Sequence, residues 1–283
     1  LYYYRPTSKA LWDSLVLDPN PGYRESFVNQ LFTGFLFNQL VLAYFKPANR
    51  FGEEYRLSMD LEFSGLEILG VESIYNSITG RRDEFKFLND ISYTKFLKFS
   101  SSGSYLRKFG SDRAIGLQLS TGILIPINNN SPYVKQFYAG GANGVRAWQE
   151  RDLGPGGFID TTDNSILPYQ KADFRLDLMS ELRFPIFSYL KGAVFLDAGN
   201  VWTIKKDARD NALLTPDFYK QIAIGTGIGF RLDIELAVIR LDIGQKIRLP
   251  YENESTGNNW ALKNIEDISF RELNYNLALG YPF

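Results

Sequence analysis

Residues 173–186 read DFRLDLMSELRFPI, and the side chains alternate in character along this stretch with a period of two. That period is typical of a β-strand, whose successive side chains point to opposite faces. Five charges on one face cannot cover a packed apolar core, so that face predicts a wet lumen or open solvent. The apolar face holds Phe174, Leu176, Leu178, Leu182, Phe184 and Ile186, and the charged face holds Asp173, Arg175, Asp177, Glu181 and Arg183.

The same alternation recurs along most of the chain and predicts nine strands, each long enough for a tilted membrane strand of ~9–11 residues. Residues 1–34 have room for a tenth strand. Besides 173–186, the regular runs are 113–127, 221–233, 236–248 and 273–283, and the less regular ones are 35–46, 55–69, 92–108 and 191–202.

The connections between these runs alternate in length. Outer-membrane barrels have short periplasmic turns and long external loops, whereas a soluble sandwich has no reason to segregate loops in this way. We therefore predict an all-β fold, a transmembrane antiparallel β-barrel. The long connections are 70–91, 128–172, 203–220 and 249–271, and the short ones are 47–54, 109–112, 187–190 and 234–235.

Composition excludes several classes of function. The 283 residues contain no Cys and no His, which removes thiol, Ser-His and zinc-histidine chemistry. The 31 basic and 32 acidic residues leave no basic footprint for nucleic acid. We expect no enzyme activity, cofactor or metal. Because the chain begins with Leu1 and shows no signal peptide, we expect it to be a piece of a longer precursor.

The longest connection contains the stretch YAGGANGVRAWQERDLGPG at residues 138–156. Its paired glycines, its single arginine within an uncharged patch and its closing Gly-Pro-Gly are more special backbone chemistry than an idle surface loop needs.

This stretch resembles the sixth-loop motif of the Omp85 superfamily of outer-membrane barrels. Gly140-Gly141 followed by Val145-Arg146-Ala147-Trp148 is similar to the family's Gly-Gly…Val-Arg-Gly-aromatic pattern. Ala147 stands where most members have Gly, a version shared by some members of the Bacteroidetes type. The resemblance is strongest over 113–283 and fair over 27–70. It implies a barrel of 16 strands when complete. Residues 1–283 would then be its C-terminal portion, with about nine or ten strands and a lumen-folded loop at 128–172. The N-terminal strands and periplasmic modules would lie outside this chain.

The resemblance also implies a partner for the loop arginine. Glu181 and Asp197 match the family's lumen-facing acidic positions in the two strands after the loop. A guanidinium pairs bidentately with a carboxylate, so we expect Arg146 to fix the loop to Glu181, Asp197 or both. The alternative is an exposed loop arginine beside ordinary lumen charges.

Tryptophans and glycines give two further expectations. Trp148 is expected to pack against the inner wall, and Trp202 and Trp260 to be aromatics of the membrane interface. Three glycines share the lumen face of the run 221–233, which predicts close packing by the loop and not a phosphate site, since no helix follows them. They are Gly225, Gly227 and Gly229.

The last run ends on a terminal aromatic residue and resembles the C-terminal assembly signal of outer-membrane barrels. The alternative is an ordinary amphipathic edge strand that ends in Phe. Pro282 removes a backbone hydrogen-bond donor from this run. The missing donor is consistent with a weak lateral seam, where the last strand meets the first, or with a residue that simply ends the strand. The alternating set is Leu273, Tyr275, Leu277, Leu279, Tyr281 and Phe283.

The resemblance implies a non-enzymatic factor for membrane assembly and protein insertion, a surface antigen like the BamA and TamA members, integral to the bacterial outer membrane. It would template the folding of client β-barrels at a lateral seam. Its partners would be outer-membrane lipids, unfolded outer-membrane proteins, and periplasmic or lipoprotein accessory subunits. The alternatives are a two-partner-type secretion pore, the barrel of a patatin-like lipase fusion, and a plain porin.

Overall fold

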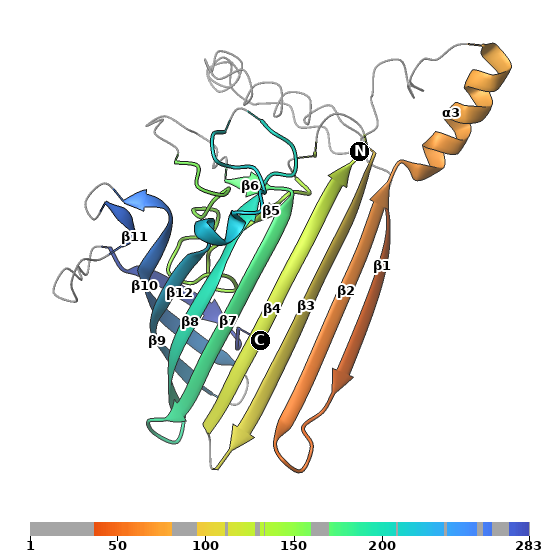
Figure 1. The fold of residues 1–283 in the computed structure, drawn as a ribbon. Helices are drawn as coiled ribbons and strands as arrows, with labels where there is room; N and C mark the ends of the chain where they lie inside the picture. Colours follow the sequence, from red (N-terminus) through yellow and green to blue (C-terminus); the bar gives the residue numbers. More distant parts are fainter. Residues whose placement is uncertain are drawn as a thin grey trace, which may run out of the picture. The chain divides into compact units, whose positions relative to one another are not determined.

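A computed structural model shows one large antiparallel sheet of ten strands (Figure 1). Its order is β1-β2-β3-β4-β7-β8-β9-β10-β11, and β12 also pairs with β10. The structure describes residues 37–80, 95–110, 113–127, 131–132, 134–159, 170–207, 209–234, 237–253, 257–261 and 272–282.

The strands follow one another as neighbours through the sheet, as hairpins do. They are β1 (Phe37–Lys46), β2 (Glu53–Ser64), β3 (Phe96–Phe109), β4 (Arg113–Pro126), β7 (Phe174–Pro185), β8 (Leu190–Trp202), β9 (Ala223–Asp233), β10 (Val238–Asn253), β11 (Asn258–Trp260) and β12 (Asn274–Leu279). Between β4 and β7, the strands β5 (Phe137–Tyr138) and β6 (Lys171–Ala172) form a separate pair, and the helical elements are α3 (Leu66–Thr79) and η1 (Phe218–Gln221). The predicted all-β antiparallel fold is confirmed, and each of the nine predicted runs contains a strand, although the bounds of several differ.

The chain divides into two compact units. The first comprises Leu1–Val41, Asp60–Phe99 and Ile123–Gln136, and the second Leu42–Met59, Ser100–Gly122 and Phe137–Phe283. The second unit contains the loop, β7–β12 and the residues of the candidate site.

In the register of β7–β10, inward and outward residues alternate as predicted. Glu181 of β7 lies opposite Phe195 of β8, and Asp197 of β8 lies opposite Gly225 of β9. Buried polar residues face the inside of these strands, while apolar residues such as Leu178 and Leu196 are exposed on the other face. An apolar face turned outward suits strands that contact lipid.

The strand predicted at 55–69 and the loop predicted at 70–91 are both partly wrong. β2 ends at Ser64, and α3 occupies Leu66–Thr79. Gly65 adopts a left-handed conformation with φ 72°, which ends the strand and starts the helix. The apolar run after Gly65 fits both periods over a short length, so alternation alone could not separate strand from helix. Among the described residues, none of the helices has both the length and the apolar character needed to span a bilayer.

Two more predicted boundaries are corrected. The connection expected at 249–271 is shorter, because β10 continues to Asn253 and β11 pairs with it. The connection expected at 128–172 contains β5 and β6, which close its base. Residues 1–34 lie outside the described part of the chain.

The last strand is also shorter than predicted. The alternation was expected to run unbroken to Phe283, but β12 ends at Leu279, and Gly280 has φ 82°. This left-handed turn ends the alternation before Tyr281. Pro282 therefore follows the strand and removes no donor from it, and Phe283 lies outside the described residues.

Trp202 was expected at the membrane interface, and this prediction is wrong. The side chain is fully buried, and its Nε1 donates to Oε1 of Gln221 at 2.8 Å. The rings of Phe174 and Phe218 lie 5.9 and 5.7 Å from its ring centre. These partners come from segments distant in the chain, so the strand pattern gave no sign of them. Trp260 is exposed.

Candidate functional site

The backbone of the loop after β5 is held in one compact path, drawn in green in Figure 1. Ala139 bridges Leu153, and the Gly141 N–H donates to the Trp148 carbonyl at 2.9 Å. Gly140 and Gly141 have φ of 91° and 83°, in the left-handed region. A Cβ added at Gly140 would lie 2.1 Å from the Gln149 carbonyl oxygen, so this turn requires glycine.

Arg146, at the far end of this loop, is completely buried against β7 and β8. Its Nε and Nη2 donate to the two oxygens of Asp197 at 2.8 and 2.9 Å, the bidentate geometry of an arginine–carboxylate pair. Its Nη1 donates to Oε2 of Glu181 at 2.5 Å, and its own backbone N–H reaches Asp197 at 3.1 Å. The structure thus brings the loop arginine together with both acidic residues singled out in the sequence.

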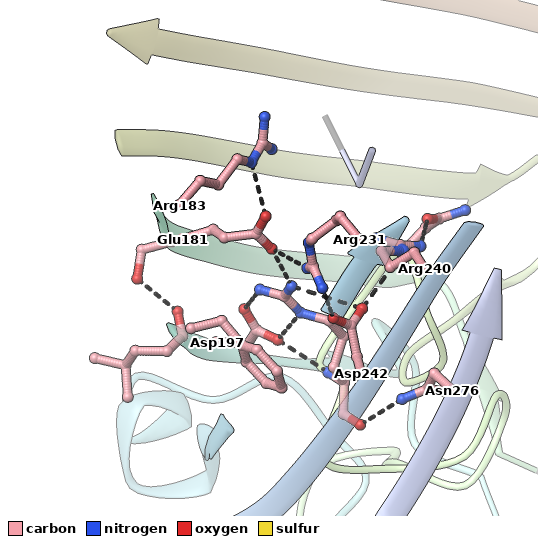
Figure 2. A network of polar contacts seen from close by, with 12 residues as sticks. Glu181, Arg183, Asp197, Arg231, Arg240, Asp242 and Asn276 are labelled. Carbon is pink, nitrogen blue, oxygen red and sulfur yellow. Dashed lines mark hydrogen bonds and ion pairs between the residues drawn. The ribbon is translucent and has the colours of Figure 1, made fainter. Parts of the chain in front are cut away.

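Four more charged residues extend this contact into what we call the charge cluster: Arg146, Glu181, Arg183, Asp197, Arg231, Arg240 and Asp242. Figure 2 shows the side chains of the six strand residues of this cluster, from Glu181 to Asp242, converging from neighbouring strands. Arg183 and Arg231 donate to Glu181 at 2.8 and 2.7 Å. Arg231 also lies 2.6 Å from Asp242, which Arg240 approaches to 3.4 Å.

The charge cluster contains four arginines and three carboxylates, all buried. Two aromatic rings face its cations: Phe195 lies 3.8 Å from the Arg146 guanidinium, and Tyr281 lies 4.4 Å from that of Arg183. The negative face of an aromatic ring attracts a guanidinium. Burial alone would lower the pKa of Arg146, but the hydrogen bonds and charge of Asp197 outweigh burial and raise the pKa above its ordinary value.

The backbone carbonyl of Arg146 binds the last strand. Nδ2 of Asn274 donates to this carbonyl at 2.9 Å, and Nδ2 of Asn276 donates to it at 2.8 Å. Both asparagines stand on the inner face of β12. One loop residue is thus bound through its side chain to β7 and β8 and through its carbonyl to β12.

Ala147 fits a recess made by two glycines of the inner wall. A Cβ added at Gly225 would lie 2.3 Å from the Ala147 Cβ, and one added at Gly244 would lie 2.7 Å from the Arg146 carbonyl oxygen. The expectation that loop packing explains the glycines therefore holds for Gly225. Gly227 and Gly229 instead make room for the Phe195 ring and for Arg231 with Asp242. Ala147 is accommodated because β9 has no side chain opposite it.

The predicted site residues fall into two groups in space. Those of the loop, Gly140, Gly141, Val145, Arg146, Ala147 and Trp148, lie together, and Trp148 is buried as expected. Those of the last run do not join them: Tyr275, Leu277 and Leu279 face outward and are exposed. Tyr281 instead turns inward onto Arg183.

The sequence analysis missed the roles of Arg231, Arg240, Asp242, Asn274 and Asn276. Strand parity places each of them on the inner face. The alternation of side chains could have identified them as inward-facing residues, but it does not indicate which inward residues the loop contacts. Among the described residues, no group of three or more acidic side chains could hold a metal ion. The cluster consists of opposite charges in close contact, although both carboxylate oxygens of Asp242 and Nε and Nη1 of Arg240 have no hydrogen-bond partner within the ranges that the structure describes.

Comparison with known proteins identifies the fold. Residues 85–263 match the Omp85 superfamily domain. No curated protein matches the sequence. Among solved structures, the chain is similar to BamA from Haemophilus ducreyi lacking POTRA domains 1–3, at 12% identity and a TM-score of 0.42, over 86% of this chain and 54% of that one. It is also similar to CdiB from Acinetobacter baumannii, at 14% identity and a TM-score of 0.33, over 79% of this chain and 40% of that one. The chain thus spans about half the length of these structures or less.

Proposed function

The chain belongs to the Omp85 superfamily of integral outer-membrane β-barrels, and on that premise we propose that it is the C-terminal part of an outer-membrane protein assembly factor. It templates the folding of client β-barrels on the edge of β12. Omp85 barrels are generally non-enzymatic proteins of transport and assembly. In this proposal the folding of the client supplies the driving energy.

The observation that carries the proposal is the state of β12. Within the part of the chain that the structure describes, β12 pairs only with β10. An unpaired strand edge presents a row of backbone donors and acceptors, and an extended segment adds to it by β-augmentation. The outward face of β12 is apolar, so a client strand added there would enter the bilayer beside lipid-facing side chains.

In this proposal, the direction of the backbone amides determines which groups a client would use. The Gly280 N–H donates to the Val238 carbonyl of β10 at 2.7 Å. Successive amides of a strand point to opposite sides, so the N–H groups of Asn274, Asn276 and Ala278 also point to β10. Those of Leu277 and Leu279 point to the other edge, where a client would bind.

The charge cluster has a supporting role in this proposal. Arg146 fixes the loop to β7 and β8 and holds β12 by two hydrogen bonds to its carbonyl. The loop therefore acts as a brace that positions the template edge. The partners are unfolded outer-membrane proteins, outer-membrane lipids, and periplasmic or lipoprotein accessory subunits.

Replacing one edge amide tests the proposal. Leu277→Pro removes an N–H that points away from β10, so the β10–β12 ladder stays intact and proline is tolerated at an edge. In cells depleted of the native protein, we expect this variant to insert but not to restore the levels of many outer-membrane barrels. Leu277→Ala, which keeps the N–H, should restore them.

The outcomes separate the alternatives. Wild-type levels of client barrels with Leu277→Pro would contradict edge templating. If depletion lowered a single exported protein and left other outer-membrane barrels unchanged, the secretion-pore alternative would replace the proposal.

A further inference from the structure

A groove of about 570 Å³ lies on the outward face of the sheet, away from the charge cluster. Its walls are leucines of β2, β4 and β7 together with a tyrosine of β1. They are Leu57, Leu117, Leu119, Leu178 and Tyr44. All four leucines belong to the exposed apolar face that contacts lipid in an outer-membrane barrel.

Gly103 of β3 makes this face hollow. It stands between leucine-bearing strands, and a Cβ added there would meet only Cδ1 of Leu57, at 3.8 Å. The site therefore has room for a larger side chain that the sequence does not provide. In a bilayer, an apolar hollow on the lipid-facing side is filled by part of a lipid acyl chain.

Aromatic and cationic groups stand at one end of the groove. The rings of Tyr55 and Tyr105 lie 5.0 Å apart, and Nζ of Lys46 lies 5.5 Å from the centre of the Tyr55 ring. Lys46 and Tyr55 flank the short connection between β1 and β2, and Tyr105 precedes the short turn after β3. Short turns mark the periplasmic side, and tyrosines concentrate at the level of lipid headgroups. This end of the groove therefore lies in the periplasmic leaflet.

The charges at this end favour an anionic headgroup. Arg107 shares the face of Tyr105, and Arg113 shares the face of Leu117, because residues two apart in a strand lie on one face. Both are exposed, as is Lys46. Glu53 is the acidic residue on the same face, where it accepts a hydrogen bond from Asn49 at 3.0 Å. Among the described residues at this end, three cations thus stand beside one carboxylate, and a Lys or Arg near a membrane surface attracts anionic lipid.

We propose that this groove is a binding site for an anionic glycerophospholipid of the periplasmic leaflet. One acyl chain lies over Gly103 between Leu57 and Leu119. The phosphate contacts Lys46 and Arg107 beside the two tyrosines. The proposal is independent of client assembly, because none of the residues that line the groove belongs to β12 or to the charge cluster.

Lipid titration of the full-length protein, followed by native mass spectrometry from detergent, tests this site. The probes are phosphatidylglycerol, which is anionic, and phosphatidylethanolamine with the same acyl chains. We expect phosphatidylglycerol to bind roughly tenfold more tightly, and the double variant Lys46→Gln/Arg107→Gln to remove that preference. Lys206→Gln, which neutralises an exposed cation in a long connection, should leave the preference unchanged.

Gly103→Leu is the second test, because it fills the hollow and leaves every charge in place. We expect it to abolish the tight binding of phosphatidylglycerol and to weaken the binding of phosphatidylethanolamine as well. Retention of wild-type affinity and stoichiometry by Gly103→Leu would overturn the proposal. Equal binding of the two lipids by the wild-type protein would overturn it as well. Migration of the unheated protein on a gel shows that each variant is folded.

Discussion

The charge cluster and β12 are neighbours in the second unit, and they are held in very different ways. In the charge cluster, every side chain is buried, and each arginine lies against a carboxylate of its own or another element. β12 is six residues long, and two of its outward leucines, Leu277 and Leu279, are 76% and 78% exposed. Asn274 and Asn276 connect the two regions at one carbonyl.

This difference shows how one sheet can combine a fixed inner wall with a less firmly held strand. The inner wall is the part of β7–β10 that carries the charge cluster, and the other strand is β12. Burying ion pairs adds little net stability, because desolvation offsets the attraction between the charges. What such a network provides is a unique geometry, since removing any one partner leaves a buried charge uncompensated. The inner wall is therefore specified by charge, while β12 is a short strand that pairs only with β10 among the described residues.

Reversing the charge at the centre of the wall should have the largest effect. Arg146→Glu places a third carboxylate against Asp197 and Glu181, and loss of even one partner of a buried pair costs about 3–5 kcal/mol. We expect little or no folded protein, measured by the migration of unheated samples on a gel. Arg151→Glu, in the same loop but with a half-exposed side chain, is the matched control and should fold. A folded Arg146→Glu protein would show that the cluster does not hold the wall.

Closing the recess under Ala147 should have a smaller effect that can be reversed. Gly225→Ala places a methyl group 2.3 Å from the Ala147 Cβ, and overpacking of this kind costs about 1–3 kcal/mol. We expect a lower unfolding midpoint in lipid. Combining Gly225→Ala with Ala147→Gly returns the lost space and should restore the midpoint. If the double variant is no more stable than Gly225→Ala alone, these residues do not pack as described.

Removing the connection to β12 should loosen the edge and leave the wall intact. Asn274→Ala with Asn276→Ala leaves the Arg146 carbonyl without these two donors, and an unsatisfied buried acceptor costs about 1–3 kcal/mol. We expect faster proteolysis near the C-terminus, with the segment containing β7 and β8 still resistant. The exposed Asn258→Ala serves as the control. Equal resistance of the double variant and the control would argue against the connection.

The contact of Tyr281 with Arg183 should have the smallest effect. Tyr281→Ala removes a ring 4.4 Å from the guanidinium, a contact worth about 0.5–2 kcal/mol. A small decrease in the unfolding midpoint is expected, and Tyr281→Phe should retain most of the wild-type value. If Tyr281→Phe were as damaging as Tyr281→Ala, the hydroxyl and not the ring face would be the important group.

The strands were predictable because alternation along a lipid-facing strand is local information. The short turns, the inner faces and the acidic partners of Arg146 follow from parity and from the resemblance to the family. The end of β12 was not predictable, because Gly280 interrupts an apolar pattern that continues to Phe283 in the sequence. Helix α3 was missed because a short apolar run fits both periods.

The wider charge cluster was not predictable for a different reason. Parity places Arg231, Arg240 and Asp242 on the inner face, but many other inward residues share that face. Which of them meet depends on the stagger between strands and on the path of the loop. Both are set by packing between segments distant in the chain, such as Ala147 against Gly225.

Hydrogen exchange of the full-length protein in lipid, compared with an Arg146→Lys variant, tests the link between wall and edge most directly. Lysine keeps the charge but cannot form the bidentate contact with Asp197, so the loop carbonyl loses its fixed position under β12. We expect the β12 amides to exchange at least about tenfold faster in the variant, while β1 and β2 keep their wild-type rates. Unchanged exchange in β12, with the loop itself loosened, would contradict it.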